Sequence, residues 1–282
     1  MKIARIKNEK IGETYAIVSE DEKRLITKSE IQEQTGIPIP PRIKEFMFEG
    51  WLNEVKEHQG KLEYIHRIED VGLLAPLPNP SKIICLAKDA GLTPSDEPVI
   101  FMKPRTTLNP PFSDIICPSF VKRLDYEAEI AAIIGKDIKK VSVEHALDSI
   151  FGYMILHDVS ARDIQFKDKQ FTRGKSIDTF APCGPWITTK DEIEDPQNLK
   201  IITKVNGEIR QNSSSINMVI PIKKIISSLS TLMTIEAGDI ISTGTPAGVA
   251  MSMKEPKYLK DDDIVEISIE RLGMIRNRIV FR

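Results

Sequence analysis

The sequence holds only three cysteines, Cys85, Cys117 and Cys183, which are far apart and form no Cys-x-x-Cys pair. That scarcity argues against a disulfide framework and against a cysteine-based zinc site, so we expect buried, unreactive thiols. No apolar run approaches the roughly 20 residues that a membrane-spanning helix needs. The charged N-terminus, Met-Lys-Ile-Ala-Arg-Ile-Lys, has no signal-peptide core, and a cytoplasmic protein without a membrane partner is expected.

The chain also lacks an excess of charge of either sign, since its formal net charge is −2. There is then no general electrostatic case for a nucleic-acid partner or an acidic membrane surface. Its 282 residues are 41% hydrophobic and 28% charged, which is ordinary for a globular protein. This length allows one large domain or two modest ones, either of which buries a sizeable core.

A proline-rich connector at residues 74–80 predicts a boundary between a small N-terminal domain, residues 1–75, and a larger domain, residues 76–282. In the first part we expect short strands, a short helix from Ser29 and an amphipathic helix over 43–58. In the second part, Asn206-Gly207 predicts a hairpin turn. Helices are expected at 143–149 and 221–231. Strands are expected at 82–86, 98–104, 124–136, 150–158, 240–242, 264–269 and 278–281.

The strand at 124–136 carries an unusual pair of carboxylates, Glu127 and Glu129. Alternate side chains of a strand share one face, so these two carboxylates lie roughly 7 Å apart in an apolar setting. They repel unless a positive group lies between them, and oxygen ligands suit hard cations such as Mg²⁺, Ca²⁺ or Mn²⁺. The alternative is that Glu-x-Glu is a solvated sheet face.

Two further charged residues are placed to complete such a site. Asp158 ends the apolar strand 150–158, where an unpaired carboxylate is costly to bury, so it is a natural third metal ligand. It could instead cap a helix that starts near Ala161. Lys175 lies among apolar neighbours and could be an amine with a depressed pKa, a fixed cation or a surface lysine.

Five segments, in matching order and spacing from about Pro78 to the C-terminus, resemble the fumarylacetoacetate hydrolase family. They are Asp125-Tyr126-Glu127-Ala128-Glu129 with Gly135-Lys136, His157-Asp158-Val159-Ser160-Ala161-Arg162-Asp163, Arg173-Gly174-Lys175-Ser176-Ile177-Asp178-Thr179-Phe180, Val205-Asn206-Gly207-Glu208 and Thr243-Gly244-Thr245-Pro246-Ala247-Gly248-Val249. The resemblance implies a β-rich α+β fold, a mixed β-sheet roll with flanking helices, paired as a homodimer.

The resemblance also implies an active site. Its Mg²⁺- or Mn²⁺-type metal is held by Glu127, Glu129 and Asp158. Lys175, as a catalytic cation, and Thr179 match positions beside the metal. Gln165 and Thr245 match positions that contact the substrate, which is a small 2-oxo or β-dicarbonyl acid. A dicarbonyl acid can chelate the metal, which stabilises the developing enolate with help from a fixed cation such as Lys175.

One departure from the family pattern bears on the reaction. Hydrolytic members carry a water-activating His–Glu pair after the first strand of this domain, and residues 86–94 here contain no histidine. C–C bond hydrolysis is the reaction most often associated with the family, while isomerisation, decarboxylation or dehydration are alternatives that need only enolate stabilisation. A non-catalytic protein that binds metal and oxo acid is the rival from another class. The position of Asp89 or Glu97 relative to the metal would help to discriminate these possibilities.

Overall fold

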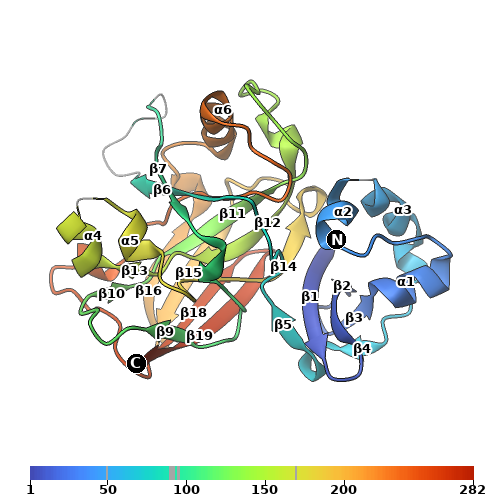
Figure 1. The fold of residues 1–282 in the computed structure, drawn as a ribbon, viewed down its shortest axis with the longest axis horizontal. Helices are drawn as coiled ribbons and strands as arrows, with labels where there is room; N and C mark the ends of the chain where they lie inside the picture. The colour runs from blue at the N-terminus through green and yellow to red at the C-terminus, as the bar shows by residue number, and fades with distance from the viewer. Residues whose placement is uncertain (49, 89–92, 94–95, 169) are drawn as a thin grey trace.

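The computed structural model describes residues 1–282 except residues 49, 89–92, 94–95 and 169 (Figure 1). Its largest element is a 12-stranded mixed sheet that runs through the whole molecule. Along the main path the strands are β4 (His66–Arg67), β3 (Arg24–Thr27), β2 (Gly12–Val18), β1 (Lys2–Asn8), β14 (Ala181–Thr189), β12 (Ile150–His157), β11 (Ala128–Ile134), β17 (Ile240–Ser242), β6 (Ile83–Lys88) and β7 (Val99–Lys103). Two short strands pair off this path, β5 (Gly72–Leu74) with β1 and β8 (Leu108–Asn109) with β14.

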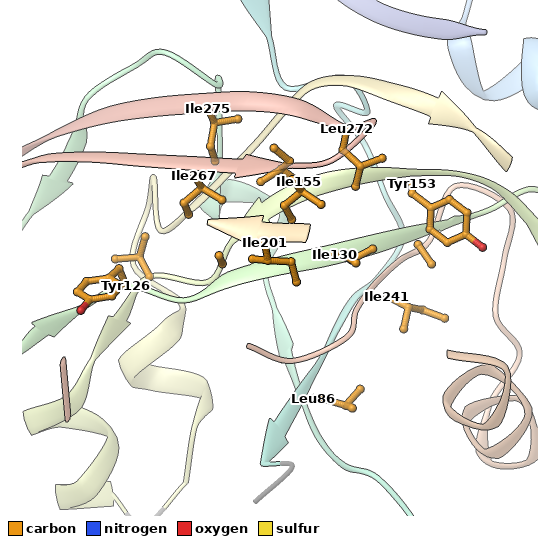
Figure 2. Close-up of a cluster of buried hydrophobic side chains, with 14 of the residues drawn as sticks. Leu86, Tyr126, Ile130, Tyr153, Ile155, Ile201, Ile241, Ile267, Leu272 and Ile275 are labelled. Atoms are coloured by element: carbon orange, nitrogen blue, oxygen red, sulfur yellow. The ribbon is translucent and has the colours of Figure 1, made fainter. Parts of the chain in front are cut away.

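A second, five-stranded sheet packs on the central strands of the first. Its order is β16 (Glu208–Ser214), β15 (Lys200–Val205), β18 (Ile264–Ile269), β19 (Gly273–Phe281) and β9 (Ile115–Cys117). Figure 2 shows Ile130 and Ile155 of the large sheet meeting Ile201, Ile267 and Ile275 of the small one. The strand-rich α+β architecture predicted from the sequence is confirmed.

Both faces of β11 and β12 are buried, because alternate residues enter two different cores. Ile130 and Ile155 face the small sheet, whereas Ile133 and Leu156 face a second core that includes Phe46 of the N-terminal part. This explains why the sequence of both strands is apolar almost throughout.

Six α-helices cover these sheets among the residues that the structure describes. They are α1 (Lys28–Thr35), α2 (Ile43–Phe48), α3 (Trp51–His58), α4 (Arg162–Asp168), α5 (Thr172–Lys175) and α6 (Ile222–Leu232). None of these helices has the length and apolar character that crossing a membrane would require. The helix expected at 221–231 is present as α6, and its apolar stripe, Ile222, Ile225, Ile226 and Leu229, is buried.

The N-terminal part, with β1–β5 and α1–α3, lies to the right in Figure 1. Strand β1 joins it to the main sheet by pairing Lys2 with Thr188 and Ile3 with Ile187. The N-terminal ammonium of Met1 donates to Thr189 Oγ1 at 2.8 Å, which fixes the end of this strand. The domain boundary after residue 75 stays a prediction.

Three local predictions from the sequence can be compared directly with the structure. The single helix over 43–58 is wrong: α2 and α3 are separate, and Gly50 between them has a φ of +70° that a helix cannot continue. In place of the helix predicted at 143–149, the structure has only a short 3₁₀ helix, Ala146–Ser149. The hairpin is confirmed, with Asn206 and Gly207 at φ values of 50° and 82°.

Candidate active site

The candidate site is built where β11 begins and β12 ends. The predicted strand 124–136 is interrupted, since β10 (Leu124–Asp125) stops before Tyr126 and β11 starts at Ala128. Strand β10 pairs instead with β13 (Ser160–Ala161). Asp158 directly follows β12, and its N–H donates to the Glu127 carbonyl at 2.9 Å. This bond brings together two strand ends that are 31 positions apart in sequence.

The three carboxylates converge as the sequence predicted. One ligand oxygen each from Glu127, Glu129 and Asp158 lies within 4.8 Å of the others, and all three residues are buried. A solvated sheet face is therefore wrong for the Glu-x-Glu pair. The Asp158 side chain is not a helix cap either, because its two oxygens accept hydrogen bonds from Lys103 and Lys175.

Lys175 lies between two of these carboxylates. Its Nζ is 2.6 Å from Glu127 Oε2 and 2.5 Å from Asp158 Oδ2, and the residue is only 2% exposed. Burial alone would lower the pKa of Lys175, but the charges of Asp158 and Glu127 raise it above its ordinary value. Of the three interpretations left open by the sequence, the fixed cation is the one the structure supports.

Close packing of the short helices α4 and α5 places Lys175 between Glu127 and Asp158. Gly174 precedes it, and a Cβ atom on Gly174 would lie 2.8 Å from the Ala161 carbonyl oxygen and 2.9 Å from the Gln165 nitrogen. Only a residue without a side chain lets α5 approach α4 this closely.

Sequence reasoning missed two further cations and their partners. Lys103, at the end of β7, donates to Asp158 Oδ1 at 2.6 Å. Arg162 donates from Nη2 to Glu127 Oε1 at 2.5 Å and from Nε to Asp125 Oδ2 at 3.0 Å. Lys103, like Asp158, is a charged residue at the end of an apolar strand. The pattern that identified Asp158 in the sequence could therefore have identified Lys103 as well.

The fourth carboxylate of the cluster, Asp125, is tied to the protein itself. Besides Arg162, it accepts from the backbone nitrogens of Ala250 and Met251 at 2.8 and 3.1 Å. It is therefore a structural anchor for the residues around it rather than a free oxygen donor.

Glu129 is the least satisfied member of the cluster. Its Oε2 accepts from Ser242 Oγ at 2.5 Å and from the Gly244 nitrogen at 3.1 Å, whereas its Oε1 is buried without a hydrogen-bond partner among the described residues. Burial, together with the charges of Asp158 and Glu127, raises the pKa of Glu129 to about 8. A buried oxygen without a donor in an all-oxygen trio fits a hard divalent cation, which would supply the missing partner.

The remaining predicted site residues lie near this cluster but engage protein groups. The Gln165 side chain accepts from Arg162 Nη1 at 3.1 Å. The Thr245 hydroxyl donates to the Ala128 carbonyl at 2.9 Å, directly between Glu127 and Glu129. Thr179 has a φ of +72° and accepts from the Ile116 nitrogen at 2.9 Å. Their contacts with substrate or metal stay predictions.

All four histidines are described, and none can activate water at the trio. His157 precedes Asp158 and lies on the side of β12 that carries Ile155, opposite the side on which Glu129 pairs with Leu156. Burial lowers the pKa of His157 to about 3. His66 contacts Glu30, His145 contacts Asp148, and His58 contacts the Glu54 carbonyl.

The sequence left open whether Glu97 or Asp89 lies near the metal site. The Glu97 carboxylate accepts hydrogen bonds from Lys224 and Ser228 of α6. Asp89 lies outside the described residues.

The fold places a buried carboxylate trio where β11 begins and β12 ends, with Lys103 and Lys175 beside it, and this arrangement defines a candidate metal-assisted enzyme. Residues 81–280 match the family model described as "Fumarylacetoacetate (FAA) hydrolase C-terminal", and the chain belongs to this family.

Comparison with individual proteins shows that several of its relatives are enzymes. The chain is 40% identical over 241 residues to the oxaloacetate tautomerase YisK of Bacillus subtilis, covering 81% of this chain and 79% of that protein. It is similar in structure to a fumarylacetoacetate hydrolase from Exiguobacterium antarcticum, with a TM-score of 0.84, 33% identity and full coverage of both chains. A second similar structure is the maleylpyruvate hydrolase from Sphingobium sp. SYK-6 in complex with manganese(II) and pyruvate. Its TM-score is 0.81 at 29% identity, with coverage of 100% of this chain and 99% of that one.

Proposed function

We propose that this protein is a divalent-metal-dependent tautomerase that interconverts the keto and enol forms of a small 2-oxo dicarboxylic acid of the oxaloacetate class. The observation that carries the proposal is the buried trio Glu127, Glu129 and Asp158, in which Glu129 Oε1 accepts no hydrogen bond from any residue that the structure describes. The similarity to the oxaloacetate tautomerase of Bacillus subtilis supports the choice of reaction.

The charge balance of the cluster supports both the metal and an acidic substrate. When Glu129 is ionised, as metal binding favours, the four carboxylates, including Asp125, outnumber the three cations, Lys103, Arg162 and Lys175, by one. A divalent ion turns this excess of one negative charge into one positive charge, which attracts an anionic acid. Oxygen-only ligands favour Mg²⁺ or Mn²⁺, with Ca²⁺ as the further hard cation.

Tautomerisation needs a site that stabilises an enolate but no base that activates water. One proton leaves C3 of the keto acid, one proton arrives at the 2-oxo oxygen, and no other bond breaks, so no attacking water has to be activated. The bound metal supplies Lewis-acid polarisation of the 2-oxo group. The Lys175 ammonium provides a fixed positive charge against the developing enolate oxygen, while Gln165 and the backbone around Thr245 are proposed to hold the substrate.

The experiment follows the decay of enol-oxaloacetate to the keto form by ultraviolet absorbance. Chelator-treated protein is assayed alone and after addition of Mg²⁺ or Mn²⁺, with Glu129→Gln as the test variant and exposed Glu144→Gln as its matched control. We expect metal-dependent acceleration that Glu129→Gln loses and Glu144→Gln keeps. Acceleration that is equal in Glu129→Gln and wild type would contradict the proposal.

A second candidate is C–C bond hydrolysis of an acylpyruvate, which the sequence resemblance suggested first. The similar maleylpyruvate hydrolase, solved with manganese(II) and pyruvate, favours it. Product analysis decides between the reactions: hydrolysis gives two acid fragments, decarboxylation releases CO₂, dehydration releases water with a new double bond, and tautomerisation leaves the carbon skeleton intact. Metal-dependent binding of oxalate with no turnover of any substrate would instead favour a non-catalytic binding protein. A homodimer in the cytoplasm remains the proposed state and location.

A further inference from the structure

Glu127, directly before β11, and Glu129, within it, are separated by a single residue, Ala128, whose peptide groups are held in an unusual way. Asp158 N–H donates to the Glu127 carbonyl across the β11–β12 ladder. Because antiparallel bonds alternate, the N–H and C=O of Ala128 point to the opposite edge. The strand on that edge, β17, pairs with β11 only over Ala131–Ile133. Side chains must therefore satisfy the Ala128 peptide groups.

Gln211, from β16 of the other sheet, is one of those side chains. Its Oε1 accepts from the Ala128 nitrogen at 3.2 Å, and its Nε2 donates to Thr245 Oγ1 at 2.9 Å. Thr245 in turn donates to the Ala128 carbonyl at 2.9 Å. The two peptide groups between Glu127 and Glu129 are thus held from one side by two side chains that also bind each other.

The orientation of the Gln211 amide is fixed at both ends. Oε1 also accepts from Thr203 Oγ1 at 2.7 Å, and Nε2 also donates to the Pro246 carbonyl at 2.9 Å. With four hydrogen bonds and no exposed surface, the amide uses two acceptor and two donor positions. A glutamate would lose both donors, and a methionine would lose all four bonds.

We propose that Gln211, acting through Thr245 and the Ala128 peptide, is the positioning residue that holds Glu127 and Glu129 in register for one metal ion. This inference rests on the proposed function, because it assumes that these carboxylates bind a metal. Groups that orient metal ligands typically change metal affinity about 10–100-fold when they are removed.

The test measures the affinity for Mn²⁺ alone, from the electron paramagnetic resonance signal of the free ion, together with the unfolding midpoint. Gln211→Met is compared with Asn277→Leu, since Asn277 is also a fully buried amide, and its Nδ2 donates to backbone carbonyls including that of Ser113 at 2.8 Å. We expect both variants to lower the unfolding midpoint. Only Gln211→Met should weaken Mn²⁺ binding, by about tenfold or more.

A second pair of variants keeps the proposal testable if Gln211→Met does not fold. Thr245→Ser keeps the hydroxyl that contacts Ala128 and should bind Mn²⁺ as wild type does, whereas Thr245→Val should bind it more weakly. In the double variant Gln211→Met/Thr245→Val, the loss should not exceed the larger single loss, because the two side chains bind each other and act together on the backbone of Ala128.

Wild-type Mn²⁺ affinity in Gln211→Met, or in Thr245→Val where Gln211→Met does not fold, would overturn the positioning role. Fully additive losses in the double variant would also overturn it. Neither result would touch the proposed function if wild type still tautomerises oxaloacetate with metal. Conversely, weakened Mn²⁺ binding in Gln211→Met without any oxaloacetate turnover by wild type would support the positioning role and reject the proposed reaction.

Discussion

Lys103 Nζ lies 2.6 Å from Asp158 Oδ1, and neither side chain is exposed. Burial alone would raise the pKa of Asp158, but the charges of Lys103 and Lys175 lower it to about 2. Asp158 is therefore an ionised carboxylate in the core, and each lysine engages one of its oxygens. The stability of the fold depends strongly on the two lysines, because a buried charge without a partner lowers the free energy of unfolding.

Replacing Lys103 should consequently destabilise the protein. Lys103→Met leaves one oxygen of an ionised, buried Asp158 without its partner, and we expect the free energy of unfolding to fall by about 3 kcal/mol or more. Urea denaturation of the metal-free protein measures the loss, with exposed Lys204→Met as the matched control. Equal stability of the two variants would show that the buried pair contributes little.

Replacing Lys175 should affect the reaction rate and the binding of Mn²⁺ differently. Lys175→Met removes the cation between Glu127 and Asp158, so the tautomerisation rate should fall about 10²-fold or more, as for other electrostatic groups in active sites. Mn²⁺ binding should persist or tighten, because the carboxylates then carry less compensating charge. Exposed Lys167→Met, on the neighbouring helix α4, is the control and should match wild type in both measurements. Loss of Mn²⁺ binding in Lys175→Met would instead make this lysine a support of the metal site.

The stability of the metal-free protein should depend on pH through Glu129. Its folded pKa of about 8 lies above the ordinary value of about 4.3 for an unfolded chain. The unfolded state thus loses this proton first, and the free energy of unfolding should fall as pH rises between these values, by up to about 1.4 kcal/mol per pH unit.

Thermal unfolding of chelator-treated protein across this pH range checks the sign. Glu129→Gln carries no titrating group there and should show a flatter profile than wild type. Saturating Mn²⁺ should flatten the wild-type profile as well, because the metal favours the ionised carboxylate. A wild-type profile no steeper than that of Glu129→Gln would contradict the raised pKa.

The approach of α5 to α4 should tolerate no side chain at Gly174. In Gly174→Ala the new Cβ would lie 2.8 Å from a backbone oxygen, and we expect a loss of about 1–3 kcal/mol together with reduced activity, since Lys175 is displaced. Gly60→Ala is the matched control, because a Cβ there meets nothing within 4 Å. Urea denaturation and the enol-decay assay are the two measurements. A fully active, equally stable Gly174→Ala would show that the two helices can separate without cost.

Sequence reasoning found the residues whose local pattern is itself unusual. Glu127, Glu129 and Asp158 are carboxylates in apolar strands, and the cost of burying such charges is visible without a structure. Lys175 could be placed at the site only through the family resemblance, because its local surroundings allowed three interpretations. Gly50 was overlooked as a helix break because the apolar spacing continues on both sides of it.

Other parts of the site depend on contacts that no local pattern contains. Gln211 lies in an exposed-looking hairpin sequence, yet it reaches Ala128, which is 83 positions away. Arg162 meets Asp125 and Glu127 only because β10 pairs with β13. These partners follow from how the two sheets pack, and pairings between distant segments cannot be deduced from one sequence alone.

The most direct test of the metal site is equilibrium binding of Mn²⁺ to chelator-treated wild type and Glu129→Gln near neutral pH. The carboxylate trio predicts one tightly bound ion per chain in wild type and a large loss of affinity in Glu129→Gln, with Glu144→Gln unchanged. If wild type binds no Mn²⁺, or if Glu129→Gln binds it as tightly as wild type, Glu127, Glu129 and Asp158 do not form a metal site.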